Sequence, residues 1–154
     1  MLLRAAVLAD IPVLRTFEQG VIEAERPFSV NLKTDPVKYY DLEQLIEDTN
    51  SCLMVAEQLG EIIACGYARV ETNKIYLKPN KYTYLGFMYV SPGNRGKNLI
   101  SKILVVLVEW SNSLGIKAYK LDVYTANEAA ISAYKKFGFK PNMMEMWKED
   151  GNPS

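Results

Sequence analysis

Residues 91–104, SPGNRGKNLISKIL, follow an aromatic run, YTYLGFMYV, and join a basic, glycine-bearing turn to the start of an apolar helix. The first N–H groups of a helix have no intrahelical partner and lie at the positive end of its dipole. A strand, a turn of this kind and a helix in succession are therefore typical of phosphate binding. Arg95 and Lys97 add positive charge. The turn predicts a site for a phosphate-bearing ligand.

Two nucleotide-binding motifs do not fit this turn. A P-loop requires G-x-x-x-x-G-K-[ST], whereas Gly93 and Gly96 are too close together and Lys97 is followed by Asn98. A dinucleotide fingerprint requires G-x-G-x-x-G after the first strand, and the sequence has no such run. The chain also contains no histidine, which excludes histidine-based triads, dyads and zinc sites.

The hydrophobic pattern around the turn predicts the elements that must position it. Asp10, Asp35 and Asn127 are expected helix N-caps, and Gly138 is the expected stop of the last helix. Strands are predicted at about 2–7, 51–58, 61–71, 82–90 and 117–124, with one or two more in 139–149, and helices at about 11–25, 35–48, from the turn to 114, and 128–137.

This order predicts an α/β (α+β) fold in one domain, residues 1–154, with a mixed sheet and helices on both faces. The strand–turn–helix–strand unit over 82–124 is a βαβ crossover, so its two strands should be parallel neighbours. Ligands in such sheets bind beyond the carboxyl ends of strands. The turn at 91–98 lies at such an end, as does the sequence YTAN at 124–127.

Composition narrows the class of protein. Net charge is zero, which argues against nucleic acid as the main partner, and no apolar run is long enough to span a membrane. Cys52 and Cys65 lie in apolar strand-like segments and are expected to be buried, reduced thiols of a cytoplasmic protein. Residues 10–48 are rich in acids and residues 73–102 contain bases but no acids. These charges are either solvated surface groups or signs of ligands. In the second case, the acidic stretch indicates a cationic ligand and the basic stretch a polyanionic one.

Two motifs resemble the GNAT superfamily of acetyl-CoA-dependent N-acyltransferases. Val90-Ser-Pro92 followed by Arg95-Gly96-Lys97 is similar to the family's loop, [Q/R]-x-x-G-x-[G/A], which follows a V-x-P strand end. Downstream, NEAAISAYKKFGF at 127–139 matches the family pattern N-x-x-A-x-x-x-Y-x-x-x-G-F in full. The resemblance covers essentially the whole chain and implies a mostly antiparallel central sheet with one parallel pair.

The resemblance implies transfer of an acetyl group from acetyl-CoA to a small or peptidyl amine, by direct attack in a ternary complex and without a metal. The pyrophosphate of acetyl-CoA would lie over the backbone N–H groups of the turn, and Arg95 would add positive charge. The residues of the turn involved are Gly96, Lys97, Asn98, Leu99 and Ile100. Pantetheine would pair with the strand end, Met88, Tyr89 and Val90, where a backbone N–H would stabilise the oxyanion. No nucleic acid or membrane partner is implied, and a homodimer is left open.

Two further roles follow from the resemblance. Asn127 would hold the pantetheine amide, and the alternative is that it only caps a helix. Tyr134 would protonate the leaving thiolate, as a phenol with a pKa near 10 can. The alternative is that Tyr134 belongs to the hydrophobic core, because it is three residues from both Ile131 and Phe137 and would share their helix face.

The sequence departs from the family in the loop and does not identify the base. Asn98 and Ile100 stand where the family has small residues, although the Asn98 amide can donate to a phosphate and tolerates unusual backbone angles. Cys52 and Cys65 lack a histidine to activate them. Candidates for the base that deprotonates the amine are all carboxylates: Glu18, Glu23, Glu25, Asp122 and Glu145.

Three functions therefore remain open on sequence grounds. The first is an active acyl-CoA N-acyltransferase, for which the acidic N-terminal half suggests a cationic acceptor. The second is a non-catalytic CoA-binding or regulatory protein on the same fold, motivated by Asn98 and Ile100. The third is an interaction domain that binds no CoA. Binding of CoA separates the third from the others, and turnover separates the first from the second.

Overall fold

The computed structural model describes residues 1–34 and 37–151, which form two compact units, Met1–Asp122 and Val123–Ser154. The first unit holds a five-stranded sheet of β1 (Leu2–Ala5), β2 (Ser51–Gln58), β3 (Glu61–Thr72), β4 (Lys81–Val90) and β5 (Tyr119–Lys120). It also holds the helices α1 (Ile11–Glu25), α2 (Leu42–Glu47) and α3 (Leu99–Ser113), with short 3₁₀ turns at Leu8–Asp10 and Pro92–Asn94. The second unit holds α4 (Glu128–Phe137).

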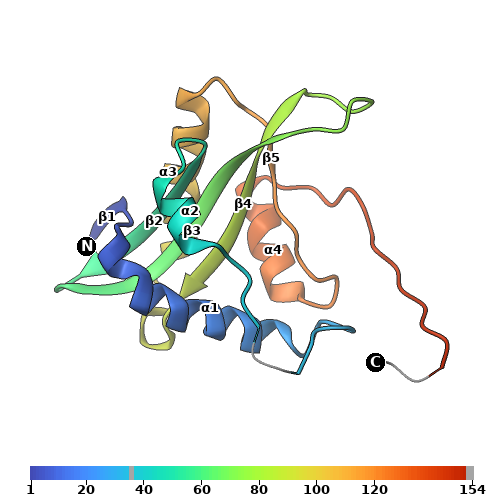
Figure 1. The fold of residues 1–154 in the computed structure, drawn as a ribbon, viewed down its shortest axis with the longest axis horizontal. Helices are drawn as coiled ribbons and strands as arrows, with labels where there is room; N and C mark the ends of the chain where they lie inside the picture. The colour runs from blue at the N-terminus through green and yellow to red at the C-terminus, as the bar shows by residue number, and fades with distance from the viewer. Residues whose placement is uncertain (35–36, 152–154) are drawn as a thin grey trace. The chain divides into compact units, whose positions relative to one another are not determined.

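The strands follow one another in the sheet in chain order, β1-β2-β3-β4-β5 (Figure 1). The first three pairings are antiparallel and β4 pairs with β5 in parallel, as the crossover through α3 requires. The expected mixed, mostly antiparallel sheet with one parallel pair is confirmed. The hairpin between β2 and β3 turns at Leu59 and Gly60, which both have the positive φ of a tight two-residue turn.

Helices cover both faces of this sheet, and side-chain alternation explains which face each one takes. Cys65 and Tyr67 on β3 point into a core shared with Leu14 of α1 and Leu42 of α2. Gly66 lies between them and faces the other side of the sheet, because successive residues of a strand alternate in direction. A β-carbon at Gly66 would accordingly meet Ile103 of α3. Figure 1 accordingly draws α1 and α2 in front of the sheet and α3 behind it.

A β-bulge interrupts the pairing of β3 with β4. Cys65 lies opposite Tyr89 and Tyr67 opposite Gly86, so the single residue Gly66 faces two residues of β4. One of the two, Phe87, has a φ of 56°, the left-handed region that a bulky residue rarely adopts. Bulges bend a strand and increase its twist, and they are frequent beside active sites. This bend lies near the end of β4, shortly before the predicted turn at 91–98.

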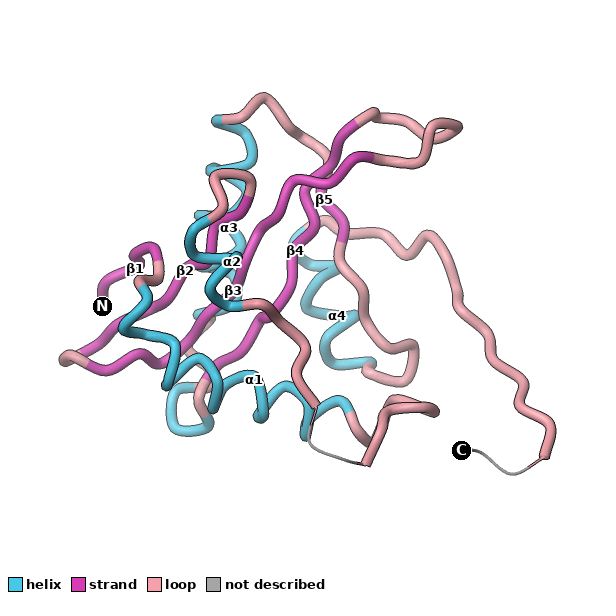
Figure 2. The backbone as a smooth tube through the Cα atoms, in the orientation of Figure 1, coloured by secondary structure: helices cyan, strands magenta, loops and turns pink. Residues whose placement is uncertain are grey.

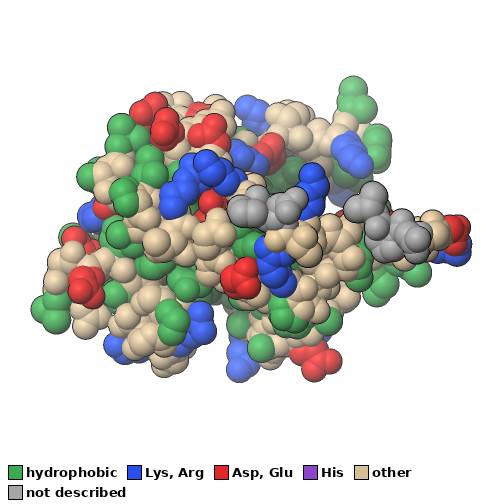
Figure 3. All heavy atoms as spheres, turned by 60° about the horizontal axis from the view of Figure 1, so that its bottom comes forward, with side chains coloured by type: hydrophobic (Ala, Val, Ile, Leu, Met, Phe, Trp, Pro, Cys, Tyr) green, Lys and Arg blue, Asp and Glu red, His purple; other side chains and the backbone are tan. Residues whose placement is uncertain are grey.

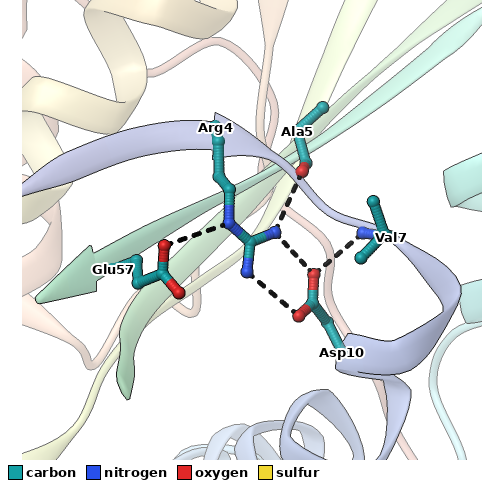
Figure 4. Close-up of polar contacts among 5 residues, drawn as sticks. All are labelled: Arg4, Ala5, Val7, Asp10 and Glu57. Atoms are coloured by element: carbon teal, nitrogen blue, oxygen red, sulfur yellow. Dashed lines mark hydrogen bonds and ion pairs between the residues drawn. The ribbon is translucent and has the colours of Figure 1, made fainter. Parts of the chain in front are cut away.

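The corner between β1 and α1 is fixed by a network around one arginine (Figure 4). The Arg4 guanidinium donates to both carboxylate oxygens of Asp10, at 2.8 and 3.1 Å, and to Glu57 on β2 at 3.4 Å. Asp10 also accepts from the backbone N–H of Val7 at 2.8 Å. Asp10 lies at the expected N-cap position of α1, but its carboxylate accepts from Val7 and Arg4 and makes no capping bond to α1. The helix itself, from Ile11 to Glu25, is as predicted.

The second helix is shorter than the predicted 35–48. It begins at Leu42, and Asp41 caps it by accepting from the N–H of Gln44 at 3.1 Å. The N–H groups of Tyr39 and Tyr40 are held instead by the carboxylate of Glu18, which keeps the segment before Asp41 out of a helix. The expected cap and first turn, Asp35 and Pro36, lie outside the described residues.

The C-terminal part of the chain departs most from the prediction. Pairing of β5 with β4 is confined to Tyr119 and Lys120, so the strand predicted over 117–124 is mostly absent. In the second unit α4 is confirmed, capped by Asn127 and ended by Gly138 at a φ of 118°. The described residues after it, 139–151, contain no strand, and Figure 2 draws them as loop. A strand requires a pairing partner, and the described part of this unit offers none.

The described surface carries mixed charge. On the face drawn in Figure 3, Lys and Arg side chains and Asp and Glu side chains are scattered among apolar groups. Among the helices that the structure describes, none has the length and apolar character needed to cross a bilayer.

Candidate active site

The predicted phosphate turn has the backbone geometry of an anion-binding loop. After the 3₁₀ turn at Pro92–Asn94, Gly96 and Asn98 both have positive φ, 84° and 58°. A β-carbon on Gly96 would meet no atom within 4 Å, so the loop surface is open there. Such left-handed residues turn successive backbone N–H groups toward one side, and the concave surface they form binds anions. Gly96, Lys97 and Asn98 are exposed.

Helix α3 begins directly after this turn. Asn98 occupies its N-cap position, and its exposed side chain makes no capping bond to the helix. The first hydrogen bond of the helix runs from Lys102 N–H to the carbonyl of Asn98 at 3.2 Å, which leaves the earlier N–H groups without an intrahelical partner. Leu99 is buried and anchors the helix start, and Ile100 is half-buried. The arrangement suits a negatively charged group.

One side chain, that of Arg95, ties the turn to the end of β4. Arg95 donates to the carbonyl of Val90 at 3.2 Å, and its guanidinium lies 5.9 Å from the centre of the Tyr89 ring. The Tyr89 ring in turn lies over Gly20 of α1, where a β-carbon would be 2.5 Å from the tyrosine hydroxyl. Lys97 is held by Asn94 at 3.1 Å. Arg95 is thus ordered by the strand and the aromatic ring beneath it.

The edge of β4 that faces β5 is open beyond Tyr84. No described strand pairs with this edge between Leu85 and Val90, because the ladder to β5 ends at Tyr84. The thiol of Cys65 donates to the carbonyl of Phe87 at 3.4 Å and so holds the bulge from the side of the core. Met88, Tyr89 and Val90 are half-buried along this edge. An extended ligand could add to it as a strand does.

A cluster of three tyrosines, Tyr40, Tyr67 and Tyr84, lies beside the bulge, and Asp122 is bonded to one of them. The Tyr40 ring stacks on Phe87 with centroids 4.4 Å apart, and Tyr67 lies 5.8 Å from Tyr40 and 6.2 Å from Tyr84. The Tyr84 hydroxyl donates to Asp122 at 3.1 Å. Burial, together with the charges of Glu25 and Asp122, raises the pKa of the Tyr84 phenol well above its ordinary value. Tyr84 therefore stays protonated.

In the second unit, the downstream motif forms a regular helix. The Asn127 side-chain oxygen accepts from Ala130 N–H at 3.3 Å, which confirms its role as a cap. Tyr134 is half-buried on α4, and its ring meets Phe139 edge to face with centroids 6.0 Å apart. The roles predicted for Asn127 and Tyr134 toward a ligand stay predictions.

The sequence profile of the acetyltransferase (GNAT) family matches residues 19–139. The chain belongs to this family. Over 60 residues it is 37% identical to the "Uncharacterized N-acetyltransferase YobR" of Bacillus subtilis, a match that covers 39% of this chain. The matched segment spans about a quarter, 24%, of the relative's length.

Solved structures share the fold across the whole chain. A mutant of the BH1408 protein from Bacillus halodurans superposes with a TM-score of 0.85 at 17% identity, covering 97% of this chain and 99% of the other. A "predicted acetyltransferase with acetyl-CoA" from Clostridium acetobutylicum gives 0.73 at 19% identity, with 96% and 95% covered. At these identities the likeness concerns the fold.

Five carboxylates of this GNAT chain are candidates for the base that deprotonates the amine, and their surroundings differ sharply. Glu18 is 0% exposed and accepts from Tyr39 and Tyr40 N–H at 3.0 and 2.9 Å and from Arg15 at 3.3 Å, so its oxygens are occupied structurally. Glu23 is exposed and paired with Arg26 at 3.0 Å.

The remaining three carboxylates also differ. Glu145 is exposed and bonded to Trp147, and Asp122 is exposed and bonded to Tyr84. Glu25 is half-buried at the end of α1, and burial raises the pKa of its carboxyl against the opposing effect of a hydrogen bond with Tyr39. Of the five, Glu25 has the surroundings that best suit a base.

The cysteines have no catalytic character. Cys65 is completely buried and its pKa is raised well above the ordinary value by burial, which disfavours a reactive thiolate. Cys52 is only half-buried rather than buried as expected, and burial raises its pKa too. Among the residues that the structure describes, no group of three His, Cys, Asp or Glu side chains is placed to hold a metal ion.

Sequence reasoning missed three residues of the site: Gly20, Phe87 and Tyr40. A glycine within a helical pattern costs about 1 kcal/mol relative to alanine and so indicates a packing reason, which is the Tyr89 ring. A left-handed phenylalanine leaves no sequence signal. Tyr40 was read as part of a helix, and its contact with Phe87 is visible only in three dimensions.

Proposed function

We propose that this GNAT chain transfers an acetyl group from acetyl-CoA to a primary amine by direct attack in a ternary complex. The observation that carries the proposal is the open edge of the bulged strand β4, which leads into a turn with positive φ at Gly96 and Asn98. Such an edge and such a helix start fit an extended pantetheine chain and a pyrophosphate, respectively. Similar structures support this, since one is described with acetyl-CoA and an aminoglycoside N-acetyltransferase with CoA.

Each part of the ligand has its residues in this proposal. The N–H groups of Gly96 to Ile100 bind the pyrophosphate, with Arg95 and Lys97 supplying charge. Met88 to Val90 align the pantetheine, and a backbone N–H of this strand stabilises the oxyanion. Asn127 uses its oxygen for the helix cap, so it binds a pantetheine carbonyl through its NH₂ group. Acetyl-CoA supplies the activated thioester.

The protons balance with one base and one acid. Glu25 takes a proton from the acceptor ammonium and leaves a neutral amine. The amine nitrogen forms the amide bond to the acetyl carbon as the carbon–sulfur bond breaks, and the electron pair leaves on sulfur. Tyr134 gives its phenolic proton to that thiolate and is reprotonated by the second proton that the nitrogen loses. The products are the amide, free thiol and one proton returned from Glu25 to water.

Ligand binding and turnover test the proposal together. Acetyl-CoA at about a hundred times its dissociation constant should add about 2.7 kcal/mol to the free energy of unfolding, and raise Tm by several degrees. Arg95→Gln should weaken this effect, whereas Lys78→Gln, a basic residue of the β3–β4 connection, should not. Thiol release against a panel of amines then measures turnover. An unchanged Tm in millimolar acetyl-CoA would support an interaction domain instead.

A non-catalytic CoA-binding protein is the second candidate. It is motivated by Ile100, whose half-buried side chain stands beside the N–H groups where the family has a small residue. This candidate predicts stabilisation by CoA without thiol release for any amine of the panel.

A further inference from the structure

The connection between β3 and β4, residues 73–80, carries three consecutive apolar side chains that are open to solvent. Ile75, Tyr76 and Leu77 are 102%, 75% and 49% exposed. Figure 1 draws this connection as a loop that reaches past the end of the sheet, on the side away from α1. Exposed apolar runs are unfavourable on a surface that meets only water, and larger ones mark sites of interaction with proteins or membranes. These three residues are called the apolar tip below.

Hydrogen bonds within the connection hold the apolar tip in a defined shape. The backbone N–H of Asn73 donates to the carbonyl of Asn80 at 2.7 Å, and its side-chain amide donates to the carbonyl of Pro79 at 3.0 Å. Further along, the N–H of Leu77 donates to the carbonyl of Lys74 at 2.8 Å, which closes a turn. The tip is thus presented by an ordered loop and loses little entropy when it docks.

Lysines surround the apolar tip, and the sequence places no acid among them. The chain has no acidic residue between Glu71 and Glu109, and Glu71 is paired with Arg69 at 2.6 Å. Four exposed lysines belong to this end of the sheet: Lys74, Lys78, Lys81 and Lys117. None of them takes part in an ion pair between described residues. Their charges are therefore available to attract an anionic surface.

Two of the four lysines lie around a hollow at the foot of the connection. The hollow has a volume of about 560 Å³ and lies between the β3–β4 connection and the segment that joins α3 to β5. Its lining includes Lys81, Lys117 and Leu114, and the leucine is 47% exposed. Apolar side chains and ammonium groups are thus combined beside the apolar tip as well as within it.

We propose that this end of the sheet docks on the anionic surface of a lipid bilayer. The apolar tip enters the boundary between headgroups and acyl chains, and the four lysines lie at the headgroup phosphates. Apolar and aromatic side chains flanked by lysines are the composition of segments that lie in this boundary, and each base near an anionic leaflet strengthens the attachment. The turn that precedes α3 lies at the other end of β4, a strand of 10 residues, and so stays open to solvent.

The chemistry of this surface favours lipid over a macromolecular partner. Its four bases are all lysine, whereas arginine is enriched in protein interfaces and suits nucleic-acid recognition, and lysine is depleted from protein interfaces. The apolar tip also projects from the surface, so a protein partner would need a groove of matching shape. The boundary region of a bilayer is fluid and accommodates the tip without such a groove.

Co-sedimentation of the full chain with vesicles tests the docking. One set of vesicles is phosphatidylcholine alone, and the other contains about one-third phosphatidylglycerol, an anionic lipid. The expected result is partition into the anionic vesicles that is stronger by about tenfold or more, and that falls when salt of about 1 M screens the charges. Equal partition into the two sets, or no partition into the anionic set, would overturn the proposal.

Matched variants locate the contact. Lys78→Gln should weaken binding to the anionic vesicles about fivefold, the effect of one base near an anionic surface. Its control is Lys38→Gln, an exposed lysine in the segment held by Gln19 of α1, which should bind as wild type does. Ile75→Asn should weaken binding about tenfold, because an aliphatic side chain no longer leaves water. Its control is Leu59→Asn, in the exposed turn between β2 and β3.

The variants also distinguish lipid from other anionic partners and separate this proposal from the acetyl transfer. Wild-type vesicle binding by Ile75→Asn, with a loss in Lys78→Gln and melting curves showing folded proteins, would mean that charge alone makes the contact. The partner would then be an acidic polypeptide or a nucleic acid, and the lipid assignment would fall. Arg95→Gln should weaken stabilisation by acetyl-CoA without affecting vesicle binding, and Lys78→Gln should do the reverse, so either proposal can fail while the other stands.

Discussion

The carboxylate of Glu18, at the centre of α1, accepts a hydrogen bond from the backbone N–H of Tyr40 at 2.9 Å. The same oxygen accepts from Tyr39 N–H at 3.0 Å, and Arg15 balances the charge at 3.3 Å. A fully buried carboxylate thus holds the strand-like segment before α2. The ring of Tyr40 reaches Phe87 from this segment, so the fold of an N-terminal loop supports the bulge of β4.

Glu18→Gln should therefore lower the stability of the fold. The neutral amide keeps the shape of the side chain but weakens two charge-assisted bonds and removes the ion pair with Arg15, which keeps only its bond to the Tyr40 carbonyl. We expect a loss of about 1–3 kcal/mol in the free energy of unfolding, measured by urea denaturation.

Glu43→Gln, an exposed carboxylate on α2, is the control and should stay within about 0.5 kcal/mol. A loss in Glu18→Gln that is no larger than that of the control would contradict the structural role of the Glu18 carboxylate.

Asp10 should make the fold sensitive to acid. Hydrogen bonds from Arg4, aided by the N–H of Val7, hold the pKa of this carboxyl below its usual value against the effect of burial. A depressed folded-state pKa stabilises the fold above the unfolded value of about 3.9, and the contribution is lost as pH falls through the folded-state pKa. The difference in Tm between wild type and Asp10→Asn should therefore be largest at neutral pH and shrink below about pH 4.

Glu57→Gln is the comparison for this network. Its bond to Arg4 is long, 3.4 Å, and both side chains are partly exposed, so a cost of at most about 1 kcal/mol is expected. A difference between wild type and Asp10→Asn that is the same at pH 7 and pH 3 would contradict the assigned ion pair.

Asn98 should respond to substitution according to its backbone. Its φ of 58° suits glycine, so Asn98→Gly should leave the free energy of unfolding nearly unchanged and alter acetyl-CoA affinity by about tenfold or less, about one hydrogen bond. Asn98→Val places a β-branched residue in the left-handed region and should cost about 1–3 kcal/mol. Calorimetric titration and thermal melting measure both. A gain of several hundredfold in Asn98→Gly would instead indicate that the natural loop is impaired, as the regulatory alternative requires.

The elements with strong local signals were predictable, and those set by distant contacts were not. Gly138 and Asn127 define α4 through backbone preference and capping, which are properties of the local sequence. The hairpin of β2 and β3 and the parallel pair of β4 and β5 were predicted from a turn signal and a crossover, whereas the pairings of β1 with β2 and of β3 with β4 were not predicted. The start of α2 was missed because Glu18, more than twenty residues earlier in the chain, takes the N–H groups that a helix would use. The strands predicted after Gly138 were wrong because alternation alone does not supply a partner.

The site divides in the same way. The turn from Arg95 to Ile100 was predicted by a motif, since glycine and charge near a helix start leave a sequence pattern. Even the left-handed conformation of Asn98 agreed with the tolerance expected of asparagine. The bulge at Phe87 and the cluster around Tyr84 depend on pairing between β3, β4 and β5, so they became visible only with the sheet. Among the five carboxylates considered as the base, Glu25 could be chosen only once the structure showed how far each one is buried.

Tyr134→Phe tests whether the phenol takes part in the reaction. The change keeps the ring, so its packing against Phe139 should survive, and removes the one proton that the residue can donate. If Tyr134 protonates the leaving thiolate, kcat should fall by about 10²–10⁴-fold, the range for a positioned general acid. The KM for acetyl-CoA should change little, because the interaction matters mainly in the transition state.

Tyr134 as a purely packed residue predicts the opposite pattern, with a small loss of stability and near-normal turnover. Phe137→Leu on the same helix is the control, since it alters the packing next to Phe139 without touching a phenol. It should lower Tm and leave kcat within about threefold, as expected where no proton is transferred. Steady-state kinetics and thermal melting on the two variants, with an acceptor found in the amine panel, distinguish these patterns. A normal kcat in Tyr134→Phe would exclude the phenol as the acid and direct the search to an ordered water or another donor near the sulfur.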